Sequence, residues 1–269
     1  AILMRLGPRI GRFRDDGTPR VIPAHNTWMI IIGMFLIFTG FWGFYAACNV
    51  PMLDIDSSEG RTFFSATTIY LTPTTLSAIT FNFLLALSGG LLVGYMVSNG
   101  DPFWTFQGGL GGIITASAGN DLYHPVQAFF VGIVGVWTAY QLPYWVERKF
   151  KIDDAVGAVA IHGYCGTVGL VAVGFLLWGY PSSMNEGDAP ITPWGQIVSA
   201  VIVFFVMGFV PCYIAAWLLK KAGVLRIPWE VELVGLDHQM IADADADTRE
   251  YEEAEQVALH EGLREVGDS

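Results

Sequence analysis

The fold is decided by the stretch Asp153-Asp154-Ala-Val-Gly-Ala-Val-Ala-Ile-His162-Gly-Tyr-Cys165-Gly166, which opens an apolar run over residues 155–185. His162 is the only His, Lys, Arg, Asp or Glu in that run. A bilayer-spanning helix needs about twenty mostly apolar residues. An imidazole inside such a helix loses its hydration, and it is tolerated where it faces a protein interior, a partner or a water-lined path. The stretch therefore predicts a membrane helix that carries a functional histidine.

Similar runs without charge recur along the chain, which is 53% hydrophobic and only 14% charged. They predict an all-α integral membrane protein with about six transmembrane helices, in a transmembrane domain over residues 26–222. A basic cytoplasmic segment, residues 1–25, precedes this domain, and an acidic cytoplasmic tail, residues 223–269, follows it. The expected spans lie near residues 27–50, 76–98, 103–119, 124–147, 155–179 and 192–220.

The basic residues give the orientation. In a six-span topology thirteen of the fourteen lie on one side, and only Arg61 lies on the other. By the positive-inside rule the basic side is the cytoplasm. We therefore expect a multi-pass protein of the cell inner (plasma) membrane whose C-terminus is cytoplasmic.

The net charge of −11 belongs to the tail, where thirteen acidic residues from Glu230 onward face only Arg249 and Arg264. This distribution argues against nucleic-acid binding. We expect residues 230–237 to dock on cytoplasmic loops, through the basic cluster Arg148, Lys149 and Lys151. Residues beyond 242 are expected to be mobile until a partner orders them.

Glycine spacing and one proline organise the second and third spans. Pro73 interrupts the second apolar stretch, so a helix from near Ser77 to near Ser98 is expected, with residues 62–75 as an approach segment or an extra half-helix. Gly90 and Gly94 on this helix, and Gly108 and Gly112 on the next, have the four-residue spacing that lets membrane helices approach closely. Gly163, Gly166 and Gly169 indicate the same beside His162.

The other candidate residues are fewer. His162 has a structural alternative, a bond to a carbonyl of a neighbouring helix, but inside a bilayer a pathway residue is favoured. The aromatic segment Gly40-Phe-Trp42-Gly-Phe44-Tyr45 fits either an interfacial belt or a gate and cation site. No nucleotide-binding loop, metal cluster or nucleophile triad is visible, so neither an enzyme nor a cofactor is predicted. His124 is interpreted as a surface or interface residue and His25 as a cap or an interface contact. Cys48, Cys165 and Cys212 are interpreted as packing residues.

Together these segments resemble the ammonium transporter family, the Amt/Mep/Rh group, over nearly the whole chain. Gly40-Phe-Trp-Gly-Phe44 resembles a family segment that supplies one of two stacked gate phenylalanines. The stretch from Asp153 to Gly166 resembles the tenth helix, which carries the second of the twin pore histidines. Gly7-Pro-Arg-Ile-Gly-Arg-Phe13 with Ile22-Pro-Ala-His25-Asn26 resembles the loop between the fifth and sixth helices, and Gly235-Leu236-Asp237 the motif after the last helix.

The resemblance implies helices six to eleven of an eleven-helix subunit, the inverted-repeat half of an ammonium-transporter-like bundle in a homotrimer. It implies that His162 lines a pore for ammonium or ammonia and that Phe44 gates its outer end, with Trp42, Tyr45 and Cys48 near the substrate. Asp153, Asp154 and Cys165 are expected to support the histidine. A PII-type signal protein is an expected partner at the cytoplasmic face, and the lipid bilayer is the surrounding phase.

Two features limit the transfer of these roles. The family's Asn and Ser after the gate phenylalanine are Tyr45 and Cys48 in this chain. The chain also begins inside what looks like a helix end, so we expect it to be the C-terminal part of a longer membrane protein. An ammonium sensor of the same fold and a structural membrane subunit without flux remain alternatives to a transporter.

Overall fold

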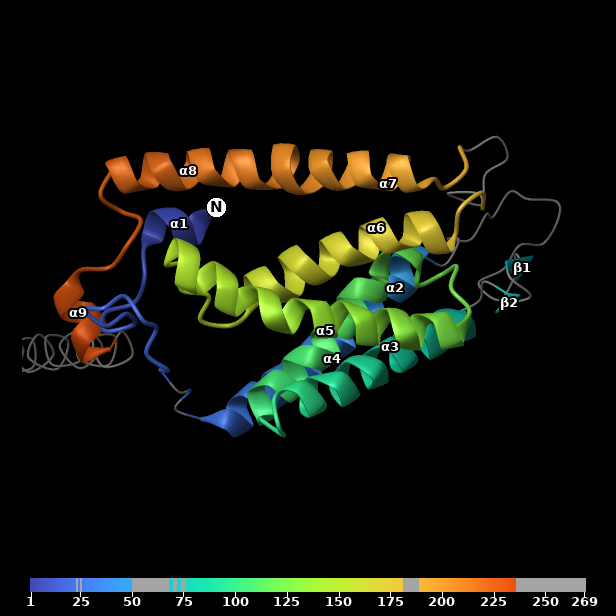
Figure 1. Ribbon diagram of the computed structural model, residues 1–269, viewed down its shortest axis with the longest axis horizontal. Helices are drawn as coiled ribbons and strands as arrows, with labels where there is room; N and C mark the ends of the chain where they lie inside the picture. The colour runs from blue at the N-terminus through green and yellow to red at the C-terminus, as the bar shows by residue number, and fades with distance from the viewer. Residues whose placement is uncertain are drawn as a thin grey trace, which may run out of the picture.

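The computed structural model describes residues 1–22, 24, 26–49, 68–69, 72–73, 76–180 and 189–235. The long helices cross the molecule alternately in opposite directions and form one elongated bundle (Figure 1). In chain order the helical elements are α1 (Ile2–Leu6), α2 (Thr27–Asn49), α3 (Leu76–Val97), α4 (Pro102–Ala116), the 3-10 turn η1 (Ser117–Gly119), α5 (Pro125–Phe150), the π-helix η2 (Val159–Cys165), α6 (Gly166–Leu176), α7 (Pro193–Ala200), the π-helix η3 (Val201–Phe209), α8 (Val210–Lys221) and α9 (Trp229–Val234).

Five helices of the described chain are long and apolar enough to cross a membrane: α2, α3, α5, η2 with α6, and the continuous helix Pro193–Lys221. Helix also occupies the third range predicted as a span, but α4 has only fifteen residues. Its start is fixed by Asp101, whose side chain accepts a hydrogen bond from the Trp104 backbone N–H, with Pro102 as its first residue. The chain is a multi-pass membrane protein.

Glycines bring α3 and α4 into backbone contact, as their spacing predicts. A methyl group on Gly90 would overlap the carbonyl oxygen of Gly108, and one on Gly94 would lie 2.8 Å from the carbonyl oxygen of Trp104. This close approach allows van der Waals attraction between the backbones, which replaces the hydrophobic drive absent between helices in lipid. The prediction for Gly90, Gly94, Gly108 and Gly112 is therefore confirmed.

Helix α4 is the centre of the bundle. Ten consecutive residues, from Gln107 to Ala116, are buried, and the helix packs on α2, α3, α5, η2 and α6. Gly169 of α6 meets the Thr115 backbone of α4, so this glycine also serves close approach. Within the described part of the chain, a methyl group on Gly163 would meet only Val159 of its own helix, so the close approach predicted there is not seen.

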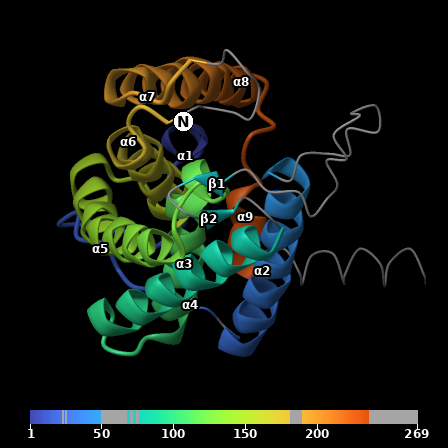
Figure 2. The ribbon, with the colours of Figure 1, turned by 90° about the vertical axis from the view of Figure 1, so that its right-hand side faces the viewer.

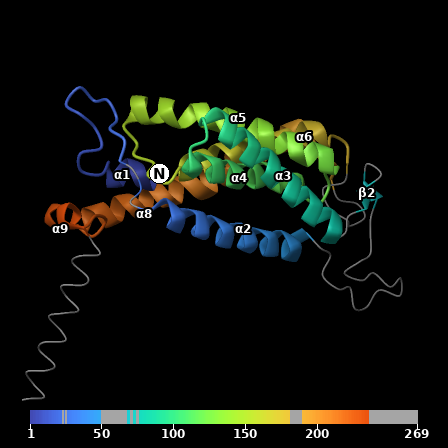
Figure 3. The ribbon, with the colours of Figure 1, turned by 90° about the horizontal axis from the view of Figure 1, so that it is seen from below.

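Helix α2 and the α7–η3–α8 helix lie at the margins of the bundle (Figures 2 and 3). The described basic residues gather at the end of the bundle where α5 and α8 finish and α1 and α9 lie (Figure 1). Among the hydrogen bonds at this end, Lys220 Nζ donates to the Arg5 carbonyl oxygen at 2.8 Å, and Lys151 Nζ donates to that of Gly17.

Two predictions need correction. Thr68–Ile69 and Thr72–Pro73 form antiparallel strands β1 and β2, so an extra half-helix is wrong at these residues. β-branched residues favour strands, and Pro73, which has no N–H, is tolerated in a short edge strand.

The docking of the tail start is confirmed for Glu232 of α9 but not through the predicted lysines. Glu232 accepts hydrogen bonds from the Ile10 backbone N–H at 2.9 Å and from Arg226. Lys149 instead lies over the ring of Trp145, with 5.0 Å between Nζ and the ring centroid. Residues 236–269, His25 and the predicted outer loop at residues 54–61 fall outside the described chain.

Candidate functional site

His162 lies in the π-helix η2, where each backbone hydrogen bond reaches one residue further than in an α-helix. Its imidazole is exposed, whereas Ala160, Ile161 and Cys165 on the opposite face of the helix are buried. Among the described residues, no hydrogen bond reaches the imidazole. Single π-helical turns occur frequently at functional sites, and this one presents an unbonded histidine on an open, otherwise apolar face.

Asp154 fixes the start of the helix that carries His162. Its two carboxylate oxygens accept hydrogen bonds from the backbone N–H groups of Ala158 at 2.9 Å and Val159 at 2.8 Å. These donors are among the N–H groups that a helix leaves without an internal partner. Burial raises the pKa of Asp154, and the backbone hydrogen bonds only partly offset that effect. The residue therefore supports His162 through helix capping.

Asp153 ties the same helix start to the segment before α2. Its Oδ2 accepts from Arg9 Nε at 2.7 Å and from the Arg9 backbone N–H at 3.0 Å, and its Oδ1 accepts from Arg9 Nη2 at 2.9 Å. Arg12 Nε lies 3.3 Å from Oδ1, and Arg12 also pairs with Glu147 of α5. Burial alone would raise the pKa of Asp153, but the Arg9 hydrogen bonds and the two guanidinium charges lower it below its ordinary value.

Cys165 is a packing residue of this region. It is fully buried, and its Sγ lies 3.7 Å from the carbonyl oxygen of Gly135 in α5. It lies one turn from His162 but on the buried face of the helix, so it supports the helix position and does not line the open face.

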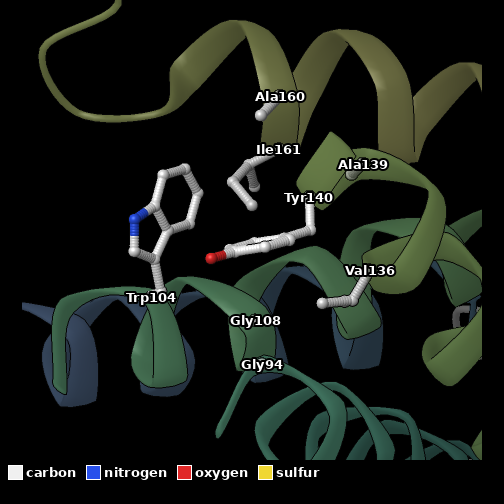
Figure 4. Close-up of a pocket in the computed structure, with 8 residues that line it drawn as sticks. All are labelled: Gly94, Trp104, Gly108, Val136, Ala139, Tyr140, Ala160 and Ile161. Atoms are coloured by element: carbon white, nitrogen blue, oxygen red, sulfur yellow. The ribbon is translucent and has the colours of Figure 1, made fainter. Parts of the chain in front are cut away.

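A small pocket lies behind the histidine helix, between the rings of Trp104 and Tyr140 and the residues Ala160 and Ile161 (Figure 4). The two ring centroids are 5.5 Å apart in an edge-to-face arrangement. The pocket leaves a volume of only about 10 Å³, at the lower limit for one water molecule. The structure is therefore closed on this side of the histidine helix, and the imidazole of His162 is accessible from its exposed face.

The aromatic segment of α2 is divided between an open and a packed face. The Phe44 side chain is 58% exposed, and the Trp42 indole, 39% exposed, donates from Nε1 to Thr80 Oγ1 of α3 at 3.0 Å. Tyr45 is only 2% exposed, and its hydroxyl bonds to the Ile113 carbonyl oxygen of α4 at 3.2 Å and to Ser117 Oγ. The Cys48 backbone is helical, and its side chain lies outside what the structure describes.

The two candidate positions lie on separate elements. Phe44 is near the end of α2, whereas His162 is near the start of the η2–α6 helix, and α4 packs on both elements. The structure brings Asp153, Asp154 and Cys165 to the histidine helix, whereas the described ring contacts of Phe44 are with Phe41 and Tyr45 of its own helix.

Three partners were not identified from the sequence: Arg9, Thr80 and Ser117. Only Arg9 could have been suspected from the sequence, because the carboxylate of Asp153 needs a cationic partner in a largely apolar region. Thr80 and Ser117 are single hydroxyl residues in apolar helices, and such residues commonly bond only to their own backbone.

Comparison with known proteins agrees with these features. The model of the Ammonium Transporter Family matches residues 1–246. The ammonium transporter Amt2 of Archaeoglobus fulgidus is 30% identical over 252 residues, which cover 88% of this chain and 49% of that protein. Amt1 of Methanocaldococcus jannaschii is 29% identical over 237 residues (86% and 53%), and ammonium transporter 1 member 3 of Solanum lycopersicum is 28% identical over 249 residues (86% and 52%).

A solved structure described as a sensor Amt protein shares the fold, with a TM-score of 0.70 at 23% identity over 87% of this chain and 54% of that one. The chain spans about half the length of the curated relatives it matches. The family match covers most of the sequence, including the histidine helix and the aromatic segment of α2. The chain belongs to the Ammonium Transporter Family.

Proposed function

We propose that this protein conducts ammonium or ammonia across the membrane, along the exposed face of His162, with Phe44 closing the outer end of the passage. The observation that carries the proposal is the unbonded imidazole on the open face of an apolar helix whose opposite face is packed. Membership of the family and the five membrane-length helices support it.

The chemistry of the imidazole suits this task. A neutral histidine offers one hydrogen-bond donor and one acceptor, so it can pass a small polar molecule along without becoming charged. Ammonia is small and neutral, whereas an ammonium ion in the same apolar surroundings pays a large desolvation cost. We therefore infer that ammonium loses a proton before the apolar part of the passage.

In our proposal the described chain forms one side of this passage. In our proposal the other side comes from the part of the relatives that this chain does not match, and the subunits assemble as a homotrimer in the cell inner (plasma) membrane. The clustered basic residues support a cytoplasmic position for this end, and we propose that the C-terminus lies on the same side. A PII-type signal protein would act at the same face.

The test is transport by the full-length protein in proteoliposomes. We expect an inward ammonium gradient to produce flux, and His162→Ala to change its rate or its selectivity over potassium. His124→Ala is the matched control, because His124 caps α5 by accepting from the Val126 backbone N–H at 3.2 Å. His162→Ala behaving like this control would refute the pore assignment.

Phe44 gives a second, independent readout. Phe44→Ala should raise the passage of methylammonium relative to ammonium, because the exposed ring no longer closes the outer end. Equilibrium binding of ammonium without flux would identify a sensor of the same fold, and neither binding nor flux would leave a structural subunit.

A further inference from the structure

Apolar packing alone does not fix the rotation of α2 on the bundle. Among its described side chains only Met34, Phe38 and Tyr45 are buried, while large apolar residues such as Leu36 and Phe44 are exposed. Apolar contacts are not directional, and nearly the whole helix surface is apolar. A directional contact is needed to choose which residues face outward.

Hydrogen bonds from two residues of the aromatic segment supply that direction. Trp42 Nε1 donates to Thr80 Oγ1 of α3 at 3.0 Å, and the Tyr45 hydroxyl contacts Ser117 Oγ at the end of α4. We call these two pairs, Trp42–Thr80 and Tyr45–Ser117, the aromatic clamp.

Both pairs have the same construction. Thr80 Oγ1 donates its own proton to the Leu76 carbonyl oxygen at 2.8 Å, and Ser117 Oγ donates to that of Ile113 at 3.0 Å. Each hydroxyl is thereby oriented by its own helix. The lone pairs of Thr80 Oγ1 accept the Trp42 N–H, and the single proton of the Tyr45 hydroxyl is directed at Ser117 Oγ and the Ile113 carbonyl oxygen, which lie side by side at the end of α4. The clamp therefore holds α2 at two fixed acceptors on two different helices.

The geometry of α2 links the clamp to Phe44. Trp42 and Tyr45 are three residues apart and lie on neighbouring parts of one face, whereas Phe44 points away from that face. The Phe44 ring contacts Tyr45, with 5.6 Å between centroids, and Phe41, with 6.5 Å. A small rotation of α2 about its own axis would therefore change the position of the exposed Phe44 ring relative to the rest of the bundle.

We propose that the aromatic clamp sets the rotation of α2 and so positions the Phe44 ring, which makes Trp42 and Tyr45 positioning residues that do not contact substrate. Thr80 and Ser117 complete the clamp. The functional consequence rests on the proposed gate role of Phe44, but the structural consequence does not. Tyr45, buried against Phe83 with 5.9 Å between ring centroids, is then an anchor of the gate and not part of its vestibule.

The first experiment reads the position of Phe44 without transport. The full-length protein carries 4-fluorophenylalanine at residue 44, and its fluorine NMR spectrum is compared with those of Thr80→Val, Tyr45→Phe and Ser117→Ala, which remove hydroxyl groups while keeping the shape of the side chain. Ser88→Ala is the control, because Ser88 makes the same bond to its own helix, to the Leu84 carbonyl oxygen, and has no aromatic donor.

We expect a shifted or broadened fluorine signal in the three clamp variants and an unchanged signal in the control. A minor orientation should gain population by about fivefold, the shift that the loss of one ordinary hydrogen bond gives. Clamp variants with the wild-type fluorine signal would overturn the proposal.

The second experiment uses transport selectivity and the Phe44→Ala background. Thr80→Val and Tyr45→Phe should each change the ratio of methylammonium to ammonium flux by about fivefold and should add nothing when Phe44 is already alanine. Full additivity in that background would show that the clamp does not act through the ring. If the wild-type protein conducts neither ion, the proposed function fails. The fluorine spectra still test whether the aromatic clamp positions the Phe44 ring.

Discussion

The glycine-packed centre of the bundle and its marginal helices differ in how much of their surface this chain covers. In α3 and α5, 39% and 33% of the residues in the most apolar window are buried, against 17% in α2 and only 6% in the Pro193–Lys221 helix. Helices of similar length and composition therefore have opposite roles. The centre is better covered by this chain, whereas the marginal helices present most of their surfaces to lipid or to further protein.

Glycines show the same difference at atomic scale. Those of α3 and α4 face backbone atoms of the partner helix, but at Gly33, Gly40 and Gly43 of α2 a Cβ atom would have nothing within 4 Å outside its own helix. Glycine costs helix stability relative to alanine, so glycines without a close neighbour indicate a surface meant for another partner. The unmatched half of the relatives is the obvious candidate for α2.

The largest effect is expected where a glycine is in backbone contact. Gly90→Ala places a methyl group on the Gly108 carbonyl oxygen, so α3 and α4 must separate. We expect a loss of about 3 kcal/mol in the free energy of unfolding, or no folded protein. Gly40→Ala on α2 is the control and should be neutral or slightly stabilising. Thermal unfolding in detergent measures the stability of both variants. If Gly90→Ala and Gly40→Ala unfolded at the same temperature, the central and marginal helices would not differ in this respect.

The next effect concerns the polar end of the bundle. Asp153→Asn weakens the contact with Arg9, and because Arg9 is partly exposed we expect a loss of about 2 kcal/mol. The pKa of Asp153 is lowered in the folded protein, so its contribution is present above the ordinary pKa of Asp, about 4, and is lost as the pH falls through the folded value. The variant should lack this acid-dependent part of the unfolding curve, whereas Asp16→Asn, in an exposed turn, should retain it.

A smaller effect with the opposite pH dependence is expected at the neighbouring carboxylate. Asp154→Ala removes the cap of the histidine helix and should cost about 1 kcal/mol. Burial raises the pKa of Asp154, so ionisation opposes folding, and its contribution to stability falls as the pH rises from the ordinary value of Asp through the folded value. Asp154→Asn keeps an acceptor without the charge and should cost less than alanine above that range. An alanine variant as stable as wild type would show that the cap is dispensable.

The sequence predicts the helices better than it predicts their faces. The range 27–50 contains α2 (Thr27–Asn49), and 76–98 contains α3 (Leu76–Val97), because long charge-free runs have clear limits. The paired glycines predict the α3–α4 contact because their spacing encodes it. In α2, by contrast, apolar residues surround the whole helix, so no stripe identifies the face that packs.

The candidate site shows the same division. His162 and Phe44 can be found from the sequence because a histidine in an apolar run and an aromatic cluster are visible in one dimension. The π-helical turn around His162 and the bonds of Thr80 and Ser117 depend on which helices meet, and no local pattern indicates that. Tyr45 was expected near the substrate, and only the packing of α2 on α4 shows its hydroxyl in the interior.

The smallest effect is expected on the margin itself. Ile214 of α8 is exposed, whereas Ile79 of α3 is fully buried. Ile79→Ala should cost about 2–5 kcal/mol, because it leaves a cavity in the centre. Ile214→Ala should cost less than about 0.5 kcal/mol in detergent, because its side chain has the same apolar surroundings before and after unfolding.

Repeating both measurements on the assembled protein in a bilayer sharpens the comparison. If Ile214→Ala then becomes as costly as Ile79→Ala, another protein surface covers α8, and its exposure belongs to the isolated chain. If the cost stays small, the exposed face of α8 lies against lipid in the assembled protein.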